Sequence, residues 1–249
     1  MKIEKVLLLT LLVSFQTQAQ TDSLFHIQAS KSKTDLKRSL AIPALLIGTG
    51  MLATTDNDLI YREDFFEQRN KWMPRFNTHV DDYLQYAPLA GVIALNVAGI
   101  KGKHSVLNQA ALLIKSELLM TAIVYPLKKI SAVPRPDTHI LNSFPSGHTA
   151  QAFVAATFLH KEYGKDRPML SVLAYSTATG IGLLRVMNNR HWISDVLVGA
   201  GIGILSTNLV YRTHQNKWNR KHKQFAGVFL LPSYAQRTLS LSAVIPVSH

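Results

Sequence analysis

Three short stretches of the chain carry side chains that could bind and cleave a phosphate ester. They read KKISAVPRP at residues 128–136, PSGH at residues 145–148 and RVMNNRHWISD at residues 185–195. Taken alone, each has an ordinary explanation as a solvated basic cluster, a turn or a local hydrogen bond between a His and an Asp. Each stretch lies at the end of an apolar block, so helix packing can bring all three to one mouth.

Cationic and backbone donors in these stretches suit a phosphate monoester. Its charge grows on the oxygens as the P–O bond breaks, and Lys128, Arg135 and Arg185 can supply three cationic donors to it. Ser146 and Gly147 precede an apolar helical block, so their N–H groups and the helix N-terminus direct positive charge at an anion. Ser146 is also expected to cap that helix, and both roles can hold together.

Two histidines and a carboxylate could carry the reaction itself. The neutral ring of His191 is the candidate nucleophile, forming a phosphohistidine that water then hydrolyses. Asp195, one helical turn further on, can accept the other ring N–H and stabilise the cation that forms. His148 is expected to protonate the leaving alkoxide and later to activate water. The alternative is that both histidines are structural. We expect no metal and no other cofactor.

The order of the three motifs resembles the type 2 phosphatidic acid phosphatase superfamily, which also contains bacterial acid phosphatases and vanadium haloperoxidases. The pattern is Lys-x6-Arg-Pro, then Pro-Ser-Gly-His, then Arg-x5-His-x3-Asp, over residues 128–195. The resemblance implies the same catalytic and substrate-binding roles for the same residues. The family usually has Ser before the Arg of the third motif, where this chain has Leu184, so an accessory phosphate contact is lost.

Six apolar blocks must position these motifs. They occupy residues 39–55, 83–100, 105–127, 149–159, 168–184 and 196–211. Their lengths lie between those of a buried core helix and a short membrane helix. We predict an all-α, six-helix bundle of the phosphatidic acid phosphatase type that is embedded in a membrane, with a soluble all-α domain as the alternative.

The chain is divided as follows. Residues 1–19 predict a signal peptide, because two Lys precede a ten-residue apolar run that is too short to span a bilayer; a buried N-terminal helix is the alternative. An extension over 20–38 precedes the helical phosphatase domain of 39–212, and a basic tail of β character covers 213–249. Within the domain, residues 56–84 mix aromatic and charged side chains as an interfacial helix does.

The composition of the chain excludes several classes of protein and of active site. Of 249 residues, 47% are hydrophobic and 17% are charged, which excludes bulk disorder. With no Cys, the chain has no disulfide, thiolate metal site or cysteine nucleophile. A net charge of +12 suits nucleic acid, anionic lipid or phosphorylated substrates. The resemblance favours a membrane and a lipid phosphate as partners, with no nucleic acid, and leaves the oligomeric state open.

Charge also bears on topology. The loops on the side opposite the motifs carry fourteen Lys and Arg, and the motif side carries nine. The excess of positive charge marks the cytoplasmic side, so the catalytic mouth is expected to face outward. A cleaved signal followed by six full spans would place the mouth inside, so the two signals conflict. We expect an inner-membrane protein with a periplasm-facing site.

The membrane branch of the family acts on lipid phosphates, so the resemblance implies lipid A, undecaprenyl pyrophosphate or phosphatidic acid as the substrate, with lipid A ranked slightly first. The sequence also allows three alternative functions. One is a secreted, soluble, non-specific acid phosphatase with the same catalytic residues. The second is a vanadate-dependent peroxidase, and the third is a lipid-binding protein without activity.

Histidines outside the motifs are expected to be less informative. His104, His139 and His160 lie near the ends of apolar blocks, and we expect all three at the surface.

Overall fold

The computed structural model describes residues 31–55, 61–214, 229–235 and 238–244. The chain divides into two compact units, Met1–Leu36 and Lys37–His249. The predicted signal peptide, and most of the predicted extension over 20–38, lie outside the described residues.

The regular elements that the structure describes between residues 31 and 214 are all helices, as the sequence predicts for 39–212. The first described helix begins earlier than predicted, at Lys31 within the predicted N-terminal extension. The helices are α2 (Lys31–Leu52), α3 (Arg62–Trp72), α4 (Val80–Leu84), α5 (Ala87–Val97), α6 (Val106–Ser131), α7 (Gly147–Tyr163), α8 (Pro168–Met187) and α9 (Ile193–Thr213). Two strands follow, β1 (Phe229–Ala235) and β2 (Thr238–Val244), which pair antiparallel from Ala235 opposite Thr238 to Phe229 opposite Val244.

Each predicted apolar block corresponds to one of six helices, namely α2 and α5 to α9. Two short helices, α3 and α4, also form between α2 and α5, so the described part of the domain holds eight helices where the sequence predicts six. The segment 56–84 does not form one helix because Pro74 follows the last residues of α3 and cannot continue its hydrogen bonding.

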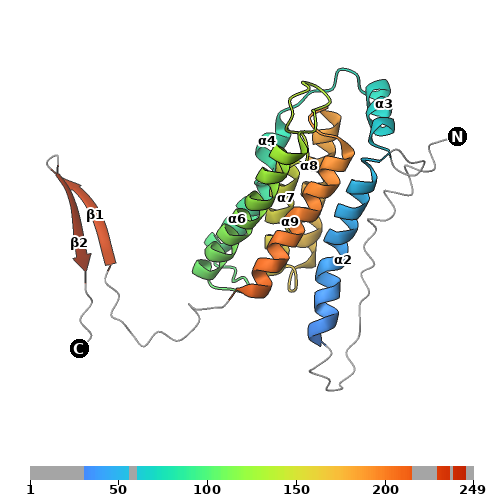
Figure 1. Cartoon of the computed structure of the whole chain (residues 1–249). Helices are drawn as coiled ribbons and strands as arrows, with labels where there is room; N and C mark the ends of the chain where they lie inside the picture. The colour runs from blue at the N-terminus through green and yellow to red at the C-terminus, as the bar shows by residue number, and fades with distance from the viewer. Residues whose placement is uncertain (1–30, 56–60, 215–228, 236–237, 245–249) are drawn as a thin grey trace. The chain divides into compact units, whose positions relative to one another are not determined.

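Helix α7 is surrounded by other helices, with α5, α6, α8 and α9 packed against it (Figure 1). Its alanines are fully buried, and glycines of α9 let the two backbones approach closely. A Cβ added at Gly203 would lie 2.4 Å from the carbonyl oxygen of Ala150, and one added at Gly199 would lie 2.5 Å from that of Ser146. This packing fixes the start of α7 against the start of α9.

Three helices, α6, α8 and α9, are long and apolar enough to cross a membrane. Only 22% of the apolar window of α6 and 28% of that of α8 is buried by the described residues, against 78% for α9. Large apolar side chains therefore face outward on α6; these include Leu107, Ile114, Leu118 and Tyr125. Such a surface is typical of a lipid-facing helix and not of a soluble protein, so a soluble secreted phosphatase is not favoured.

One expectation about the histidines outside the motifs is wrong. His104 is largely buried, with Nδ1 2.7 Å from Oε1 of Glu162, whereas His139 and His160 are exposed as predicted. Glu162 is buried at the end of α7, and a buried carboxylate needs such a partner.

Candidate active site

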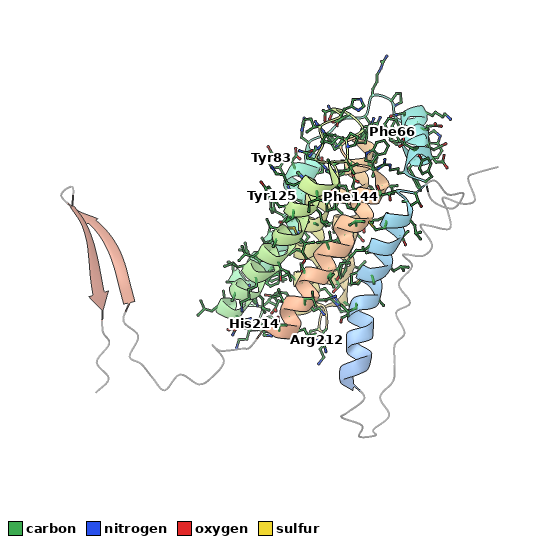
Figure 2. The ribbon with its side chains drawn as sticks, viewed as in Figure 1. Phe66, Tyr83, Tyr125, Phe144, Arg212 and His214 are labelled. Carbon is green, nitrogen blue, oxygen red and sulfur yellow. The ribbon has the colours of Figure 1, made fainter. Side chains whose placement is uncertain are left out.

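The three motifs meet at one end of the helical bundle. Residues 132–146 connect α6 to α7 there, and residues 188–192 connect α8 to α9. The backbone N–H of Ser146 donates to the carbonyl of Asp195 at 3.0 Å, which joins the second motif to the third. Figure 2 shows Phe66 and Tyr83 toward this end of the bundle, with Arg212 and His214 at the other. The shared mouth predicted from the sequence is therefore present.

His191 and Asp195 form the pair that their spacing predicts. Nδ1 of His191 lies 3.2 Å from Oδ2 of Asp195, and both side chains are almost completely buried. The same oxygen accepts the backbone N–H of Trp192 at 3.1 Å. Since the carboxylate engages Nδ1, Nε2 is the ring nitrogen left for attack on an electrophile.

A serine that the sequence reasoning missed completes this pair. The hydroxyl of Ser143 donates to Oδ2 of Asp195 and lies 3.3 Å from Nδ1 of His191. Ser143 is fully buried. Only its place two residues before the Pro-Ser-Gly-His motif could have drawn attention to it.

Burial keeps His191 neutral. Desolvation lowers the pKa of His191 to about 4, and the hydrogen bond and charge of Asp195 only partly oppose this. The charges of Lys128 and Arg185 lower the pKa further, so both cations act on the ring. A neutral imidazole is the form that can act as a nucleophile.

Lys128 and Arg135 are held by neutral oxygen atoms. Nζ of Lys128 donates to the carbonyls of Asn142 and Ser143 at 2.8 and 3.2 Å. Nε of Arg135 donates to Oδ1 of Asn142 at 2.7 Å. Burial, and then the charge of Arg185, lowers the pKa of Arg135. An anion bound between these cations would relieve that repulsion.

Arg185 has carboxylate partners that the sequence reasoning did not identify. Its Nη1 lies 2.6 Å from Oδ2 of Asp81 and 3.3 Å from Oδ1 of Asp82, both on α4. Nε of Arg185 is buried without a hydrogen-bond partner among the described residues. The two acidic residues lie in the segment interpreted as an interfacial helix. Their one signal in the sequence is adjacency in a chain with few carboxylates.

Ser146 uses both its hydroxyl and its backbone N–H to hold the fold, whereas the sequence suggested that its N–H would face an anion. Its Oγ caps α7 by accepting the N–H of Thr149 at 3.4 Å, and its own N–H is used by Asp195. The donors expected to face an anion are therefore the N–H groups of Gly147 and His148 in the first turn. A Cβ at Gly147 would lie 3.8 Å from Cε of Lys128, so this glycine lies beside a predicted phosphate contact.

His148 faces a carboxylate. Its Nε2 lies 3.0 Å from Oδ1 of Asp82. Burial and then the charge of Arg185 lower the pKa of His148, while the charges of Asp82 and Asp81 raise it. The net direction is downward, so the proton of His148 is held less tightly than in a free histidine.

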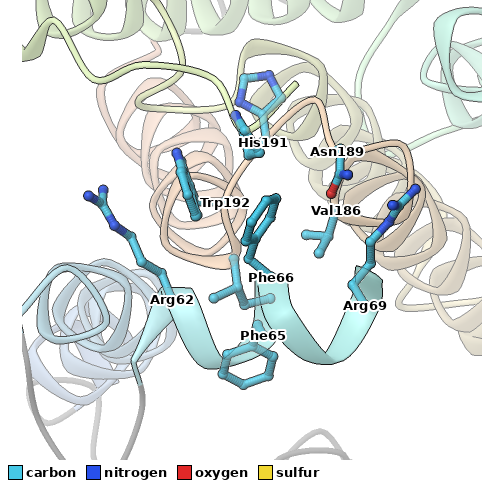
Figure 3. A pocket seen from close by; sticks show the side chains of 10 residues that line it. Arg62, Phe65, Phe66, Arg69, Val186, Asn189, His191 and Trp192 are labelled. Carbon is cyan, nitrogen blue, oxygen red and sulfur yellow. The ribbon is translucent and has the colours of Figure 1, made fainter. Parts of the chain in front are cut away.

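Helix α3 supports the loop that carries His191. Nε of Arg69 donates to the carbonyl of Met187 at 2.8 Å, at the end of α8. The rings of Phe66 and Trp192 lie 5.3 Å apart, and the guanidinium of Arg62 lies 4.8 Å from the Trp192 ring centroid. Figure 3 shows α3 crossing beside Trp192 with Phe66 directed toward that ring.

A cavity of about 250 Å³ opens beside the cationic cluster. It is lined by Thr78, His79, Asp82, Arg135, Arg185 and Arg190. The cavity has far more room than the ~30 Å³ that one water occupies in the liquid. Among the described residues, no group of three or more His, Asp or Glu side chains could hold a metal ion.

Comparison with known proteins finds one family profile and two named relatives that resemble this chain. A profile of the PAP2 superfamily matches residues 109–219, which include all three motifs. A lipid A 1-phosphatase of Porphyromonas gingivalis is 41% identical over 191 residues, or 76% of this chain and 40% of the relative. A lipid A 4'-phosphatase of Helicobacter pylori is 27% identical over 133 residues, or 49% of this chain and 62% of the relative. The chain thus spans less than two thirds of the length of either relative.

Among solved structures, the crystal structure of LpxE from Aquifex aeolicus matches with a TM-score of 0.48 and 23% identity. The match covers 64% of this chain and 99% of the other.

Proposed function

We propose, on the premise that this chain belongs to the PAP2 superfamily, that it is a membrane phosphatase that removes phosphate from a lipid phosphate through a phosphohistidine intermediate. The observation that carries this proposal is the buried, neutral His191. Its Nδ1 is hydrogen-bonded to Asp195, and the charges of Lys128 and Arg185 lower its pKa. This arrangement has the nucleophile, its orienting carboxylate and the charge that a phosphoryl group requires.

In the first step, Nε2 of His191 attacks phosphorus while the bond to the leaving oxygen breaks. His148 gives its proton to that oxygen, and Asp195 stabilises the cationic phosphohistidine. Lys128, Arg135 and Arg185, with the N–H groups of the first turn of α7, bind the charged phosphoryl oxygens.

In the second step, water attacks phosphorus on the opposite side from His191. His148, now neutral, accepts a proton from that water, and the P–N bond breaks. Inorganic phosphate and the neutral His191 ring are the products. No step requires a group beyond the chain's own residues and water.

Lipid A is the substrate we favour, with undecaprenyl pyrophosphate and phosphatidic acid next. Two relatives are named as lipid A phosphatases, which supports this order. The apolar outer face of α6 and α8 would place the site beside the lipid headgroups. The exposed ring of Trp72 on α3 is suited to the same interface.

An inner-membrane location with a periplasm-facing site is part of the same proposal. Arg212 lies at the end of the bundle away from α3 (Figure 2), and the loops predicted for that side carry the larger share of Lys and Arg. The predicted signal peptide over 1–19 would supply export.

The test is phosphate release by the full chain in detergent micelles, with EDTA present, from lipid A, undecaprenyl pyrophosphate, phosphatidic acid and p-nitrophenyl phosphate. We expect His191→Ala to abolish release, and His160→Ala, an exposed histidine of α7, to leave it unchanged. Equal rates for His191→Ala and wild type would overturn the mechanism. The lipid with the highest kcat/KM would identify the substrate class.

A further inference from the structure

Asp82 lies between two groups that the proposed mechanism uses. Its Oδ1 is 3.0 Å from Nε2 of His148 and 3.3 Å from Nη1 of Arg185. Its other carboxylate oxygen is 3.4 Å from Nδ1 of His79. Asp82 also lines the 250 Å³ cavity, so one carboxylate both borders the cavity and contacts the ring of His148.

The backbone that carries Asp82 is held by other residues. Asp81, which is fully buried, accepts from Arg185 at 2.6 Å and from Nδ2 of Asn188 at 3.1 Å. The side chain of Asn188 also exchanges two hydrogen bonds of 2.9 Å with the backbone of Thr78. Helix α4 is therefore held at the end of α8 by several contacts besides the one that Arg185 makes with the Asp82 side chain, which is 42% exposed.

Burial and Arg185 both disfavour a proton on His148, and the carboxylates on α4 oppose them. The charged groups that act on the ring are Arg185 of α8 and the two carboxylates of α4, Asp81 and Asp82. Of the neighbouring titratable groups, His79 contacts Asp82, and Lys128 of α6 lies beside Gly147, the residue before His148. Among them, Asp82 accepts directly from the ring, so Nε2 carries the proton and is directed toward the cavity.

We propose that Asp82 is a positioning residue, which keeps Nε2 of His148 protonated and aimed at the cavity until the leaving oxygen of the substrate replaces the carboxylate as its acceptor. The inference rests on the proposed function. In the reaction, the proton on Nε2 goes to the leaving oxygen as the P–O bond breaks, and Asp82 then faces a neutral ring that can take a proton from water. The carboxylate itself forms no bond to phosphorus.

This role makes the effect of Asp82 depend on the leaving group. An alkoxide from a lipid phosphate needs the proton, whereas p-nitrophenolate is stable without it. The experiment compares kcat/KM of the full chain for dioctanoyl phosphatidic acid and for p-nitrophenyl phosphate. General-acid catalysis contributes ~10²–10⁴-fold, so we expect Asp82→Asn to lower the value by at least about 10-fold for the lipid and by less than about 3-fold for p-nitrophenyl phosphate.

Further variants separate positioning from folding. Asp82→Glu keeps the charge and should recover most of the loss on the lipid. Asp166→Asn, the same change at an exposed residue after α7, should change neither substrate. In Asp82→Asn the alkaline limb of the pH profile, set by His148, should move to lower pH, while the acid limb set by His191 stays in place.

Equal losses on both substrates, or no loss on either, would overturn the inference while leaving the His191 mechanism intact. Tighter inhibition by inorganic phosphate with kcat unchanged would also overturn it, because the carboxylate would then only occupy the anion site. Failure of the proposed function is distinct, since His191→Ala would then match wild type on both substrates.

Discussion

At the scale of single residues, burial and one hydrogen bond define the chemistry of the site. The ring of His191 is neutral because desolvation outweighs the attraction of Asp195. Asp195 in turn is oriented by Ser143 and by the N–H of Trp192. Each group depends on the next, so their effects on activity are expected not to be additive.

The orienting role of Asp195 can be measured. In a comparable orienting position of a serine protease triad, replacement of the carboxylate by an amide lowers kcat by about 10⁴-fold. We expect Asp195→Asn to lower kcat by at least about 100-fold, because the amide cannot stabilise a cationic ring, and Ser143→Ala to lower it less. Rates and melting temperatures in detergent would check this. An Asp195→Asn variant with wild-type kcat would contradict the assigned role.

The pH dependence follows from the sign of each shift. His191 must be neutral, and its pKa is lowered to about 4, so activity is lost only as pH falls through about 4. His148 must be protonated in the first step, and its pKa is lowered below the ordinary histidine value of about 6.5. Activity is therefore expected to decline as the pH rises, and the decline begins at a lower pH than for an ordinary histidine. A kcat/KM profile with a maximum between these limits is expected. A maximum above pH 8 would contradict the role of His148 as the acid, and activity that persists well below pH 4 would contradict the role of His191.

At the scale of elements, close helix packing brings the motifs together. The glycines of α9 let the start of α7 lie directly against it, and the N–H of Ser146 reaches the carbonyl of Asp195 as a result. Helix α3 and helix α4 then hold the end of α8, through Arg69 and Asn188 respectively.

Substitution of Gly203 would test the close contact between α7 and α9. A Cβ at this position would lie 2.4 Å from the carbonyl of Ala150, so Gly203→Ala must separate α7 from α9. We expect destabilisation of about 1–3 kcal/mol, typical of overpacked cores. The matched control is Gly180→Ala on α8, where no atom lies within 4 Å of the added Cβ. That change should be neutral or stabilise the helix. Thermal unfolding in detergent distinguishes them, and similar melting temperatures for both would contradict the close contact.

At the scale of the whole molecule, the apolar outer surface and the charge distribution are the basis of the proposed location. The outward faces of α6 and α8 are apolar, and α7 runs from the catalytic end of the bundle to the opposite end. In the proposed membrane location, residues before and after α7 would therefore report on the two sides of the membrane.

Orientation can be determined directly because the chain has no Cys. His139→Cys lies before α7 at the catalytic end, and Asp166→Cys lies after it; both positions are exposed. We expect an impermeant maleimide added to spheroplasts to label His139→Cys, and to label Asp166→Cys only after permeabilisation. Wild type is the unlabelled control. The reverse pattern would place the site in the cytoplasm.

The sequence by itself predicted the resemblance to the type 2 phosphatidic acid phosphatase superfamily, the helical character of residues 39–212 and the meeting of the three motifs at one mouth. These follow from local spacing and from apolar blocks, which a single chain displays directly. Only the tertiary structure showed Ser143 beside Asp195, and Asp81 and Asp82 beside Arg185. Those contacts join residues up to 104 positions apart, and no periodicity relates them. It also showed the Ser146 N–H bonded to Asp195, because that bond depends on how closely α9 allows α7 to approach.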